Sequence, residues 1–347
     1  MRALTVTGRS LQVRDVPDPQ PGPGELLVEA VALGICGTDR EIVGAGRGTP
    51  PPGRDFLVLG HESLGRVVAS AGAGTPAVGD LVVGVVRRPD PEPCGACARG
   101  QFDMCRNGRY TERGIKGLDG YGSTLWTVEP EYAVVLPAEL GDGEVGVLLE
   151  PASVVAKAWE QIERIGGRAW FEPETVLVTG AGPIGQLAAL LGVQRGLDVH
   201  VLDRVEDGPK PRLVRQLGAE YHHGTADEVL SRLRPDVVIE ATGVGDLVFA
   251  AIAGTAAYGI ICLTGVSTGG RALSFDAGSV GRDMVLENDA VVGSVNANLS
   301  HYALAVDALQ RADHAWLESL ITDRIPLQDA PTNAFATNSA VKTIVTF

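Results

Sequence analysis

The stretch Val176-Leu-Val-Thr-Gly180-Ala-Gly182-Pro-Ile-Gly185 joins a run of apolar, largely β-branched residues to a cluster of glycines. The residues that follow, 186–194, are mostly small or apolar and favour a helix. We therefore expect a strand, a tight glycine turn and a helix in direct succession. Polar Thr179 and Gln186 interrupt the apolar run, so this stretch does not predict a membrane span.

The three glycines fit a turn that binds a dinucleotide. Gly180 permits the tight turn, Gly182 lets the backbone approach a pyrophosphate, and Gly185 lets the helix pack closely on the sheet. A second expected strand, 199–202, ends at Asp203, about 20 residues beyond the glycines, where a carboxylate accepts hydrogen bonds from an adenosine ribose. The alternative, a chance glycine-rich turn, leaves Asp203 unexplained. The expected cofactor contacts of this region are Gly180, Gly182, Pro183, Ile184, Gly185, Asp203 and Arg204.

Length and composition restrict the classes of protein to consider. The chain has 347 residues, of which 45% are hydrophobic, so two globular domains are expected. Its net charge of −14 makes nucleic acids and anionic membranes poor partners. Polar and charged residues follow Met1 too soon for a signal peptide, and we expect a cytoplasmic protein. The five cysteines are an odd number, which favours metal or thiol roles over disulfides.

The second half of the chain alternates strand and helix patterns. Helices are expected at 152–165, 211–217, 226–233 and 300–311, and strands at 175–179, 199–202, 236–240, 259–264 and 290–294. This alternation predicts a doubly wound parallel sheet. Glycine-containing turns follow two of these strands, at the edge where such sheets bind ligands, and they add Thr242, Gly243, Gly265 and Val266 to the expected cofactor contacts.

The first part of the chain, in contrast, is a series of short β-type runs separated by turns. Cys36 lies in a glycine-bracketed loop directly after such a run, and His61-Glu62 lies in a turn beside another. A thiolate, an imidazole and a carboxylate are ligand types that zinc accepts in tetrahedral sites. Alone, Cys36 reads as a small core residue and His61 as a solvated histidine. Together, and followed by a dinucleotide motif, they predict a metal site.

The order Cys36-Gly-Thr38-Asp, Gly-His61-Glu62-x-x-Gly and Gly-x-Gly-x-x-Gly resembles the zinc-dependent medium-chain dehydrogenase/reductase family over the full length. The resemblance implies a GroES-like β-rich catalytic domain, residues 1–155 completed by about 300–347, and a Rossmann domain, residues 156–299. It implies zinc ligands at Cys36 and His61, with Glu62 as a ligand or close to one. It also implies that Thr38 passes the substrate proton outward.

A cysteine cluster follows, with Cys94, Cys97 and Cys105 within twelve residues. Three cysteines suit a structural zinc, which needs a fourth ligand. Where relatives place a first cysteine, this chain has Asp90. A zinc site of three cysteines and Asp90 is one interpretation, and a lobe held by packing without metal is the other.

Further segments are similar to the glucose 1-dehydrogenase branch of that family. The loop Thr111-Glu112-Arg-Gly-Ile-Lys-Gly117 implies that Glu112 binds a sugar hydroxyl, although its composition alone reads as a solvated turn. The motif Leu149-Glu150-Pro151 implies that Glu150 binds the zinc directly or through water and accepts a bond from a second substrate hydroxyl. The segment from Asn296 to His301 implies contacts with the sugar and, for Asn296, with the nicotinamide.

These features predict a zinc-dependent oxidoreductase that transfers hydride from a sugar or polyol hydroxyl to NAD(P), with oxidation of glucose at C1 to the lactone as the first expectation. A dehydrogenase of a cyclitol, amino sugar, nucleoside or other secondary alcohol is the alternative within the same chemistry. A non-catalytic NAD(P)-binding protein is the alternative of another class, and it has no need to keep Cys36, His61, Glu62 and Glu150 together.

Asp203 favours NAD, because a 2′-phosphate beside it would meet an anion. Arg204, Lys210 and Arg212 are near in sequence and leave NADP use open. Because relatives pair their Rossmann sheets edge to edge, the resemblance also implies a homodimer or homotetramer. The apolar strand expected at 290–294 is compatible with such pairing.

Overall fold

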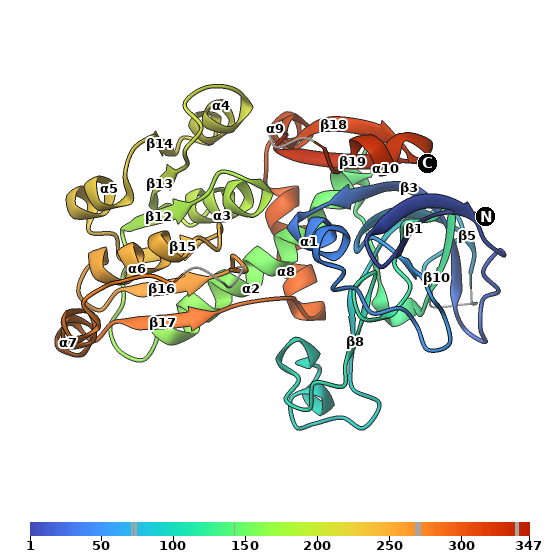
Figure 1. Ribbon diagram of the computed structural model, residues 1–347, viewed down its shortest axis with the longest axis horizontal. Helices are drawn as coiled ribbons and strands as arrows, with labels where there is room; N and C mark the ends of the chain where they lie inside the picture. Colours follow the sequence, from blue (N-terminus) through green and yellow to red (C-terminus); the bar gives the residue numbers. More distant parts are fainter. Residues whose placement is uncertain (71, 73–74, 142, 268–271, 337–339) are drawn as a thin grey trace. The chain divides into compact units, whose positions relative to one another are not determined.

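The computed structural model describes residues 1–70, 72, 75–141, 143–267, 272–336 and 340–347. The chain forms two compact units, which are visible in Figure 1. One comprises Met1–Ser153 with Asn296–Phe347, and the other comprises Val154–Val295. Within the described residues, no helix has both the length and the apolar character that crossing a membrane requires.

The unit Val154–Val295 contains a six-stranded parallel sheet in the order β14-β13-β12-β15-β16-β17. Its strands are β12 Thr175–Thr179, β13 Asp198–Leu202, β14 Glu220–His222, β15 Val237–Glu240, β16 Ile260–Leu263 and β17 Ala290–Gly293. The strand order reverses at β12, which confirms the predicted doubly wound fold.

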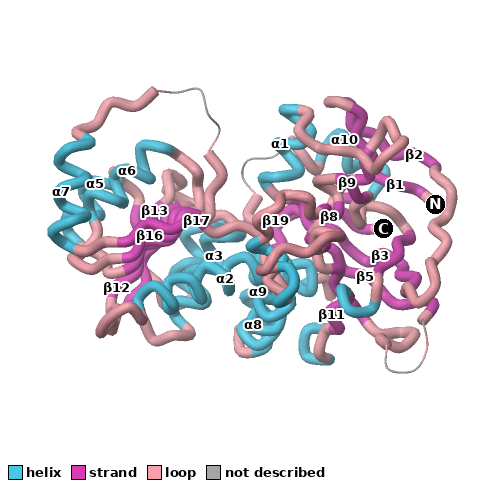
Figure 2. The backbone as a smooth tube through the Cα atoms, turned by 90° about the horizontal axis from the view of Figure 1, so that it is seen from below, coloured by secondary structure: helices cyan, strands magenta, loops and turns pink. Residues whose placement is uncertain are grey.

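Helices cover both faces of this sheet, with α5, α6 and α7 on one side and α2 and α3 on the other (Figure 2). Their bounds are α2 Leu149–Gly166, α3 Pro183–Val193, α4 Pro209–Gln216, α5 Ala226–Leu233, α6 Gly245–Gly254 and α7 Ala277–Glu287. Because both faces are covered, the central strands read as continuous apolar runs, and Val176, Leu177 and Val178 are fully buried.

The sequence predicted five of the six strands and missed β14. This strand reads Glu-Tyr-His, which is too short and too polar to produce a strand pattern. The helix after the glycine turn was also placed too late, at 186 instead of Pro183. Proline suits that first helical position because its fixed φ matches the helix and its missing N–H has no intrahelical partner there.

The glycine turn requires two of its glycines for different steric reasons. Gly180 has a φ of +93°, a conformation that disfavours any side chain. A Cβ on Gly185 would lie 1.7 Å from the carbonyl oxygen of Gly180, so α3 packs against the turn only without that atom. A Cβ on Gly182 would meet nothing within 4 Å, so the space beside it is open.

The other unit is built mainly from antiparallel strands. A seven-stranded sheet has the order β11-β6-β5-β3-β19-β18 with β10 paired to β3, and two three-stranded sheets flank it, in the orders β2-β1-β4 and β7-β8-β9. The strands are β1 Arg2–Thr7, β2 Ser10–Asp15, β3 Leu26–Ile35, β4 Leu57–Val58, β5 Glu62–Ala69, β6 Leu81–Gly84, β7 Arg87–Arg88, β8 Thr111–Arg113, β9 Gly117–Leu118, β10 Leu125–Val128, β11 Ala133–Val135, β18 Ile321–Pro326 and β19 Lys342–Thr346.

The helices of this unit are α1 Gly37–Ala45, the first turn of α2, α8 Leu299–Gln310, α9 His314–Leu320 and α10 Ala330–Asn333. Short 3-10 turns, η1 to η6, lie at Cys97–Arg99, Phe102–Met104, Pro130–Tyr132, Ala138–Leu140, Val145–Leu148 and Leu327–Asp329. Strand β19 lies beside β3, with Thr343 opposite Ile35, and the apolar core includes residues from both ends of the chain.

Three strands of the large sheet bring distant segments to one edge. Strand β3 ends at Ile35, and it pairs antiparallel with both β5 and β19. Gly34 therefore lies opposite Glu62, at the start of β5, and Ile35 lies opposite Thr343, near the start of β19. The residues that follow β3 and those that begin its two neighbours meet at this edge.

The glycine turn gives a first prediction. Gly185→Ala should lower the free energy of unfolding by about 1–3 kcal/mol, because the new methyl group collides with rigid backbone. Gly182→Ala is the matched control, since Gly182 has a φ of −77° and open space around it, and its stability should change by less than about 0.5 kcal/mol. Urea unfolding measures both, and equal stability of the two variants would contradict the steric argument.

Candidate functional site

Cys36 is positioned by a strand and a helix at once. It follows β3 directly and is the N-cap of α1, where its Sγ accepts a hydrogen bond from Thr38 N at 3.2 Å. Asp39 completes the cap by accepting a bond from Cys36 N at 3.0 Å. This local structure fixes the thiol at the edge of the large sheet, with half-buried Thr38 beside it.

His61 lies next to Cys36, with 3.0 Å between its Nε2 and the Cys36 Sγ. Its other ring nitrogen, Nδ1, faces the fully buried carboxylate of Asp39 at 3.4 Å. Burial opposes charge on this imidazole, but Cys36 and Asp39 outweigh it and raise the pKa of His61 well above its usual value. A carboxylate beside Nδ1 orients the ring so that Nε2 faces the thiol, and a metal that binds there would replace the Nε2 proton, as behind metal-bound histidines.

Two further carboxyl groups meet His61. Donor atoms of His61, Glu62 and Glu150 lie within 4.8 Å of one another, and all three side chains are buried. Burial raises the pKa of Glu150 to about 7, with a further contribution from the negative charge of Glu62 and against the lowering effect of His61. Lys342, which is fully buried on β19, donates to Glu62 Oε2 and to the carbonyl of Ile35.

This donor set fits a zinc ion. A thiol, an imidazole and carboxylates are the groups that bind zinc in catalytic sites, and here half-buried Cys36 and buried Glu62 and Glu150 all lie near His61. Buried carboxylates and a buried thiol are costly as anions unless a cation compensates them. In the structure, His61 contacts Cys36 on one side and groups with Glu62 and Glu150 on the other, so it links the four residues named from the sequence.

Glu112 is held by two partners in the same unit. Arg87 donates to its Oε1 from Nε and Nη2 at 3.0 and 2.9 Å, and Asn296 Nδ2 donates to the same oxygen at 2.9 Å. These bonds fix the carboxylate and leave its second oxygen, Oε2, for another donor. Asn296 has a φ of +62°, and its Oδ1 accepts a bond from Ala297 N.

His301 occupies the start of α8 and is buried. Its Nδ1 accepts a hydrogen bond from Asn298 N at 3.1 Å and lies 3.9 Å from an oxygen of Asp103. Asn298 donates to the other oxygen of Asp103 at 2.8 Å. His301 is therefore part of a helix cap tied to the segment before Cys105.

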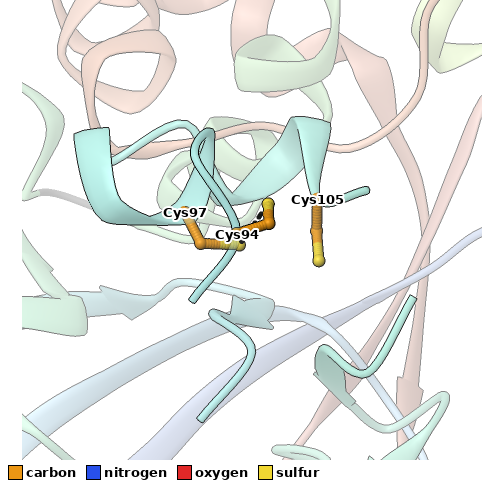
Figure 3. A group of neighbouring side chains, drawn as sticks. All are labelled: Cys94, Cys97 and Cys105. Carbon is orange, nitrogen blue, oxygen red and sulfur yellow. Dashed lines mark hydrogen bonds between the residues drawn. The ribbon is translucent and has the colours of Figure 1, made fainter. Parts of the chain in front are cut away.

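The three clustered cysteines lie on the lobe between β7 and β8 (Figure 3). Their sulfur atoms lie within 4.8 Å of one another, and those of Cys94 and Cys97 are 3.7 Å apart. Hydrogen bonds from the backbone N–H groups of Arg106 and Cys97 lower the pKa of Cys94 to about 6. These bonds stabilise a thiolate, which is the form that binds a metal.

Asp90 does not join the three sulfur atoms. Its Oδ1 accepts a hydrogen bond from Glu92 N at 2.9 Å, and its Oδ2 accepts one from Arg109 Nε at 3.2 Å. In the described residues of this lobe, the side chains grouped closely enough to bind one metal ion are Cys94, Cys97 and Cys105 only. The structure therefore does not place Asp90 with the three cysteines, in contrast to the interpretation of these four residues as one zinc site.

In the other unit, the glycine turn and Asp203 lie side by side. Asp203 accepts hydrogen bonds from Ala181 N at 2.7 Å and from Val205 N at 3.1 Å, and Lys210 Nζ lies 3.5 Å away. Arg204 is exposed. The carboxylate is thus fixed against the turn that begins α3, whose first backbone N–H groups point away from the helix.

The two other glycine turns of this unit are joined by Glu240, which is fully buried at the end of β15. Its carboxylate accepts bonds from Thr242 N at 2.8 Å and Gly243 N at 3.0 Å. A Cβ on Gly265 would lie 2.1 Å from Gly243 N, so the turns after β15 and β16 are in direct contact. Val266, beside them, is 59% exposed.

Several residues that organise these sites were missed by the sequence analysis. They are Asp39, Lys342, Arg87, Asp103 and Glu240. Asp39 had a local signal, since an acid three residues after an N-cap residue forms a capping box. Lys342 and Glu62 are 280 residues apart, so their pairing depends on the strand order and has no local signal.

Comparison with known proteins agrees with this geometry. Residues 143–347 match the family model described as glucose dehydrogenase C-terminus, and residues 22–138 match the alcohol dehydrogenase GroES-like domain. The chain is 40% identical to a glucose 1-dehydrogenase of Methanocella arvoryzae, with 99% of each chain covered. It is also 40% identical to a glucose 1-dehydrogenase of Thermoproteus tenax, with 94% of each covered.

Among solved structures, the chain is similar to a glucose dehydrogenase of Haloferax mediterranei in complex with NADP, zinc and gluconolactone. The TM-score is 0.92 and the sequence identity is 33%, over 100% of this chain and 99% of the other. This similarity covers both units and therefore includes the segments that carry Cys36, His61 and Glu150 and the glycine turn.

The buried pair of Lys342 and Glu62 gives a second prediction. Lys342→Met should destabilise the protein by about 3–5 kcal/mol, because it leaves the Glu62 carboxylate buried without its counter-ion. Lys342→Met combined with Glu62→Gln should recover most of that loss, since no charge of the pair remains. Denaturant unfolding of the two single variants and the double variant measures the coupling. A double variant as unstable as Lys342→Met alone would show that the lysine acts through packing.

Proposed function

Because the chain belongs to the glucose dehydrogenase group of the zinc-dependent medium-chain dehydrogenase/reductase family, we propose that it oxidises the C1 hydroxyl of an aldose, glucose first, to the lactone. Carbon C1 loses a hydride to the nicotinamide of NAD or NADP, and the hydroxyl proton goes to solvent. The observation that carries the proposal is the position of His61 between Cys36 and the buried acids Glu62 and Glu150, in a chain that glucose 1-dehydrogenases match from end to end.

In this proposal, Cys36 Sγ and His61 Nε2 hold the zinc. Glu150 is the carboxylate ligand, because Lys342 already engages Glu62. A zinc ion bound there supplies Lewis acidity, which lowers the pKa of a hydroxyl group. Asp39 orients His61, and Thr38, next to Cys36 on α1, receives the substrate proton and passes it outward.

Glu112 and Glu150 position the sugar. Arg87 and Asn296 fix Oε1 of Glu112, so Oε2 is directed to accept a bond from a sugar hydroxyl. Hydrogen bonds to a charged acceptor contribute about 1.5–3 kcal/mol each. Glu150 accepts from a second hydroxyl, Asn296 adds an amide near the sugar and the nicotinamide, and His301 holds the segment that carries Asn296.

The cofactor binds the unit Val154–Val295. The open space beside Gly182 admits a pyrophosphate, and the N-terminus of α3 faces it with Pro183, Ile184 and Gly185. Asp203 accepts from the adenosine ribose and favours NAD, whereas Arg204 and Lys210 allow NADP, the cofactor in the Haloferax mediterranei complex. Thr242, Gly243, Gly265 and Val266 line the nicotinamide half.

Two structural features accompany this activity in the proposal. Cys94, Cys97 and Cys105 hold a structural zinc. This is supported by their grouped sulfur atoms and by the lowered pKa of Cys94. The fourth ligand is not Asp90 in the arrangement described above.

The protein is a homodimer or homotetramer. This is supported by the partly exposed apolar strand β17 at one end of its sheet and by exposed Val285 and Leu286 on α7.

The activity test uses the zinc-containing enzyme with aldoses, polyols and a cyclitol, and it follows the absorbance of the reduced nicotinamide. The highest kcat/KM is expected with glucose or a closely related aldose. Glu112→Gln should raise KM for the sugar about tenfold to a hundredfold and change kcat less, since one charged acceptor is lost. Cys36→Ser should lose both zinc and turnover. A higher kcat/KM with the cyclitol or simple alcohols, or full activity of Cys36→Ser, would contradict the proposal.

Cofactor preference gives a separate prediction. The native enzyme should have a higher kcat/KM with NAD than with NADP, because Asp203 repels a 2′-phosphate. Asp203→Ala should narrow or invert the ratio. Asp207→Ala is the control, since Asp207 is an exposed acid of the same loop, and the ratio should stay unchanged. A native enzyme that prefers NADP would refute the role assigned to Asp203.

A further inference from the structure

A second cluster of side chains of the metal-binding types lies in the unit Val154–Val295, and none of its residues has a role in the proposed function. It is formed by Asp198 and His200 on β13 and by Glu220 and His222 on β14. These strands are parallel neighbours, with His200 opposite Glu220. Alternate residues of a strand share a face, so the four side chains project from the same side of the sheet. The imidazoles are buried, whereas the two carboxylates are largely exposed to solvent.

The distances in this cluster are those of a compact metal site. His200 Nδ1 and His222 Nε2 are 2.9 Å apart, and the two ring planes differ by 24°. Glu220 reaches both histidines, with 3.7 Å from its Oε2 to His200 Nδ1 and 3.6 Å from its Oε1 to His222 Nδ1. One donor atom from each of these three residues lies within 4.8 Å of the others.

Hydrogen bonding defines where the protons of the two imidazoles lie. Asp198 Oδ2 is 3.1 Å from His200 Nε2, so a carboxylate accepts the Nε2 proton and leaves the Nδ1 lone pair toward His222. Arg232, which can only donate, places Nη2 3.0 Å from His222 Nδ1. His222 therefore carries its proton on Nε2 and donates it to His200 Nδ1.

We propose that a divalent first-row transition ion, of the zinc, cobalt and nickel class, replaces this proton between the two rings. His200 Nδ1, His222 Nε2 and one oxygen of Glu220 ligate it, and solvent completes its coordination. The proton of His222 moves from Nε2 to Nδ1, where the second oxygen of Glu220 accepts it. Arg232 leaves Nδ1 at the same time, which its 61% exposed side chain permits. Asp198 remains on His200 Nε2 as the group that orients this ligand.

The geometry needs little adjustment for the ion. Zinc binds imidazole nitrogen at about 2.0–2.1 Å, so two nitrogens on a tetrahedral ion lie roughly 3.3 Å apart. The rings therefore separate by a few tenths of an ångström. Burial lowers the pKa of His222 against the raising effect of Glu220, and His200 and Arg232 lower it further. An ion at this place joins β13 to β14 directly before Asp203, whose N–H donates to the His222 carbonyl.

The test is titration of the full-length, zinc-containing enzyme with Co²⁺ after removal of free metal. One additional Co²⁺ per chain is expected, without the thiolate-to-cobalt absorption that binding to cysteine would give. His222→Gln and His200→Gln should each weaken this binding at least a hundredfold. His223→Gln makes the same change at an exposed neighbour and should bind as the native enzyme does.

Arg232→Ala distinguishes this mechanism from weak surface binding. Because Arg232 holds the tautomer that blocks His222 Nε2, its removal should tighten Co²⁺ binding severalfold. Unchanged or weaker binding by Arg232→Ala, or equal stoichiometry in the native enzyme and His222→Gln, would overturn the proposal. Circular dichroism verifies folding, and if a histidine variant does not fold, the Arg232→Ala result decides alone. Glucose oxidation is not measured, so this outcome is independent of the proposed function.

Discussion

The need to compensate buried charge organises the catalytic unit. Glu62, Glu150, His61 and Lys342 lie at the edge where β5, β3 and β19 meet, and their side chains are all removed from water. A buried carboxylate is costly unless a cation or several donors face it. Lys342 compensates Glu62, while Glu150, whose pKa rises to about 7 by burial and the charge of Glu62, retains its need for a cation. The fold thus favours a cation beside Glu150, because Lys342 is already paired with Glu62.

The parts of the structure that a sequence predicts are those in which neighbouring residues act together. Gly180, Gly182 and Gly185 act within one turn, so that turn was recognisable from a local pattern, whereas the helix that begins beside Cys36 was not predicted. The alternating apolar runs of the parallel sheet are also local, because helices cover both faces of each strand. Strand β14 was missed because Glu-Tyr-His at a sheet edge carries polar ligands instead of an apolar pattern.

The parts that it does not predict depend on contacts across the fold. Asn296 lies 184 residues from Glu112, and Asn298 lies 195 residues from Asp103, yet each pair is joined by a hydrogen bond. Family resemblance named Glu112 and Asn296 as substrate contacts but gave no role to Arg87, which donates to the Glu112 carboxylate. His301 shows the same limit, since its capping bond with Asn298 and its place beside Asp103 have no signal in the segment that named it as a sugar contact.

The hydrogen bonds on the two carboxylate oxygens distinguish an acid that can bind a ligand, such as Glu62 or Glu112, from one with a structural role, such as Asp90. Lys342 engages Oε2 of Glu62, and Arg87 and Asn296 both engage Oε1 of Glu112, so each acid is fixed through one oxygen and keeps the other. Asp90 uses both oxygens, one on Glu92 N and one on Arg109. A metal would have to displace a bond to recruit Asp90, whereas Glu112 binds a new partner without losing one. Residue type alone therefore overestimates Asp90 as a ligand, because all three acids look equivalent in the sequence.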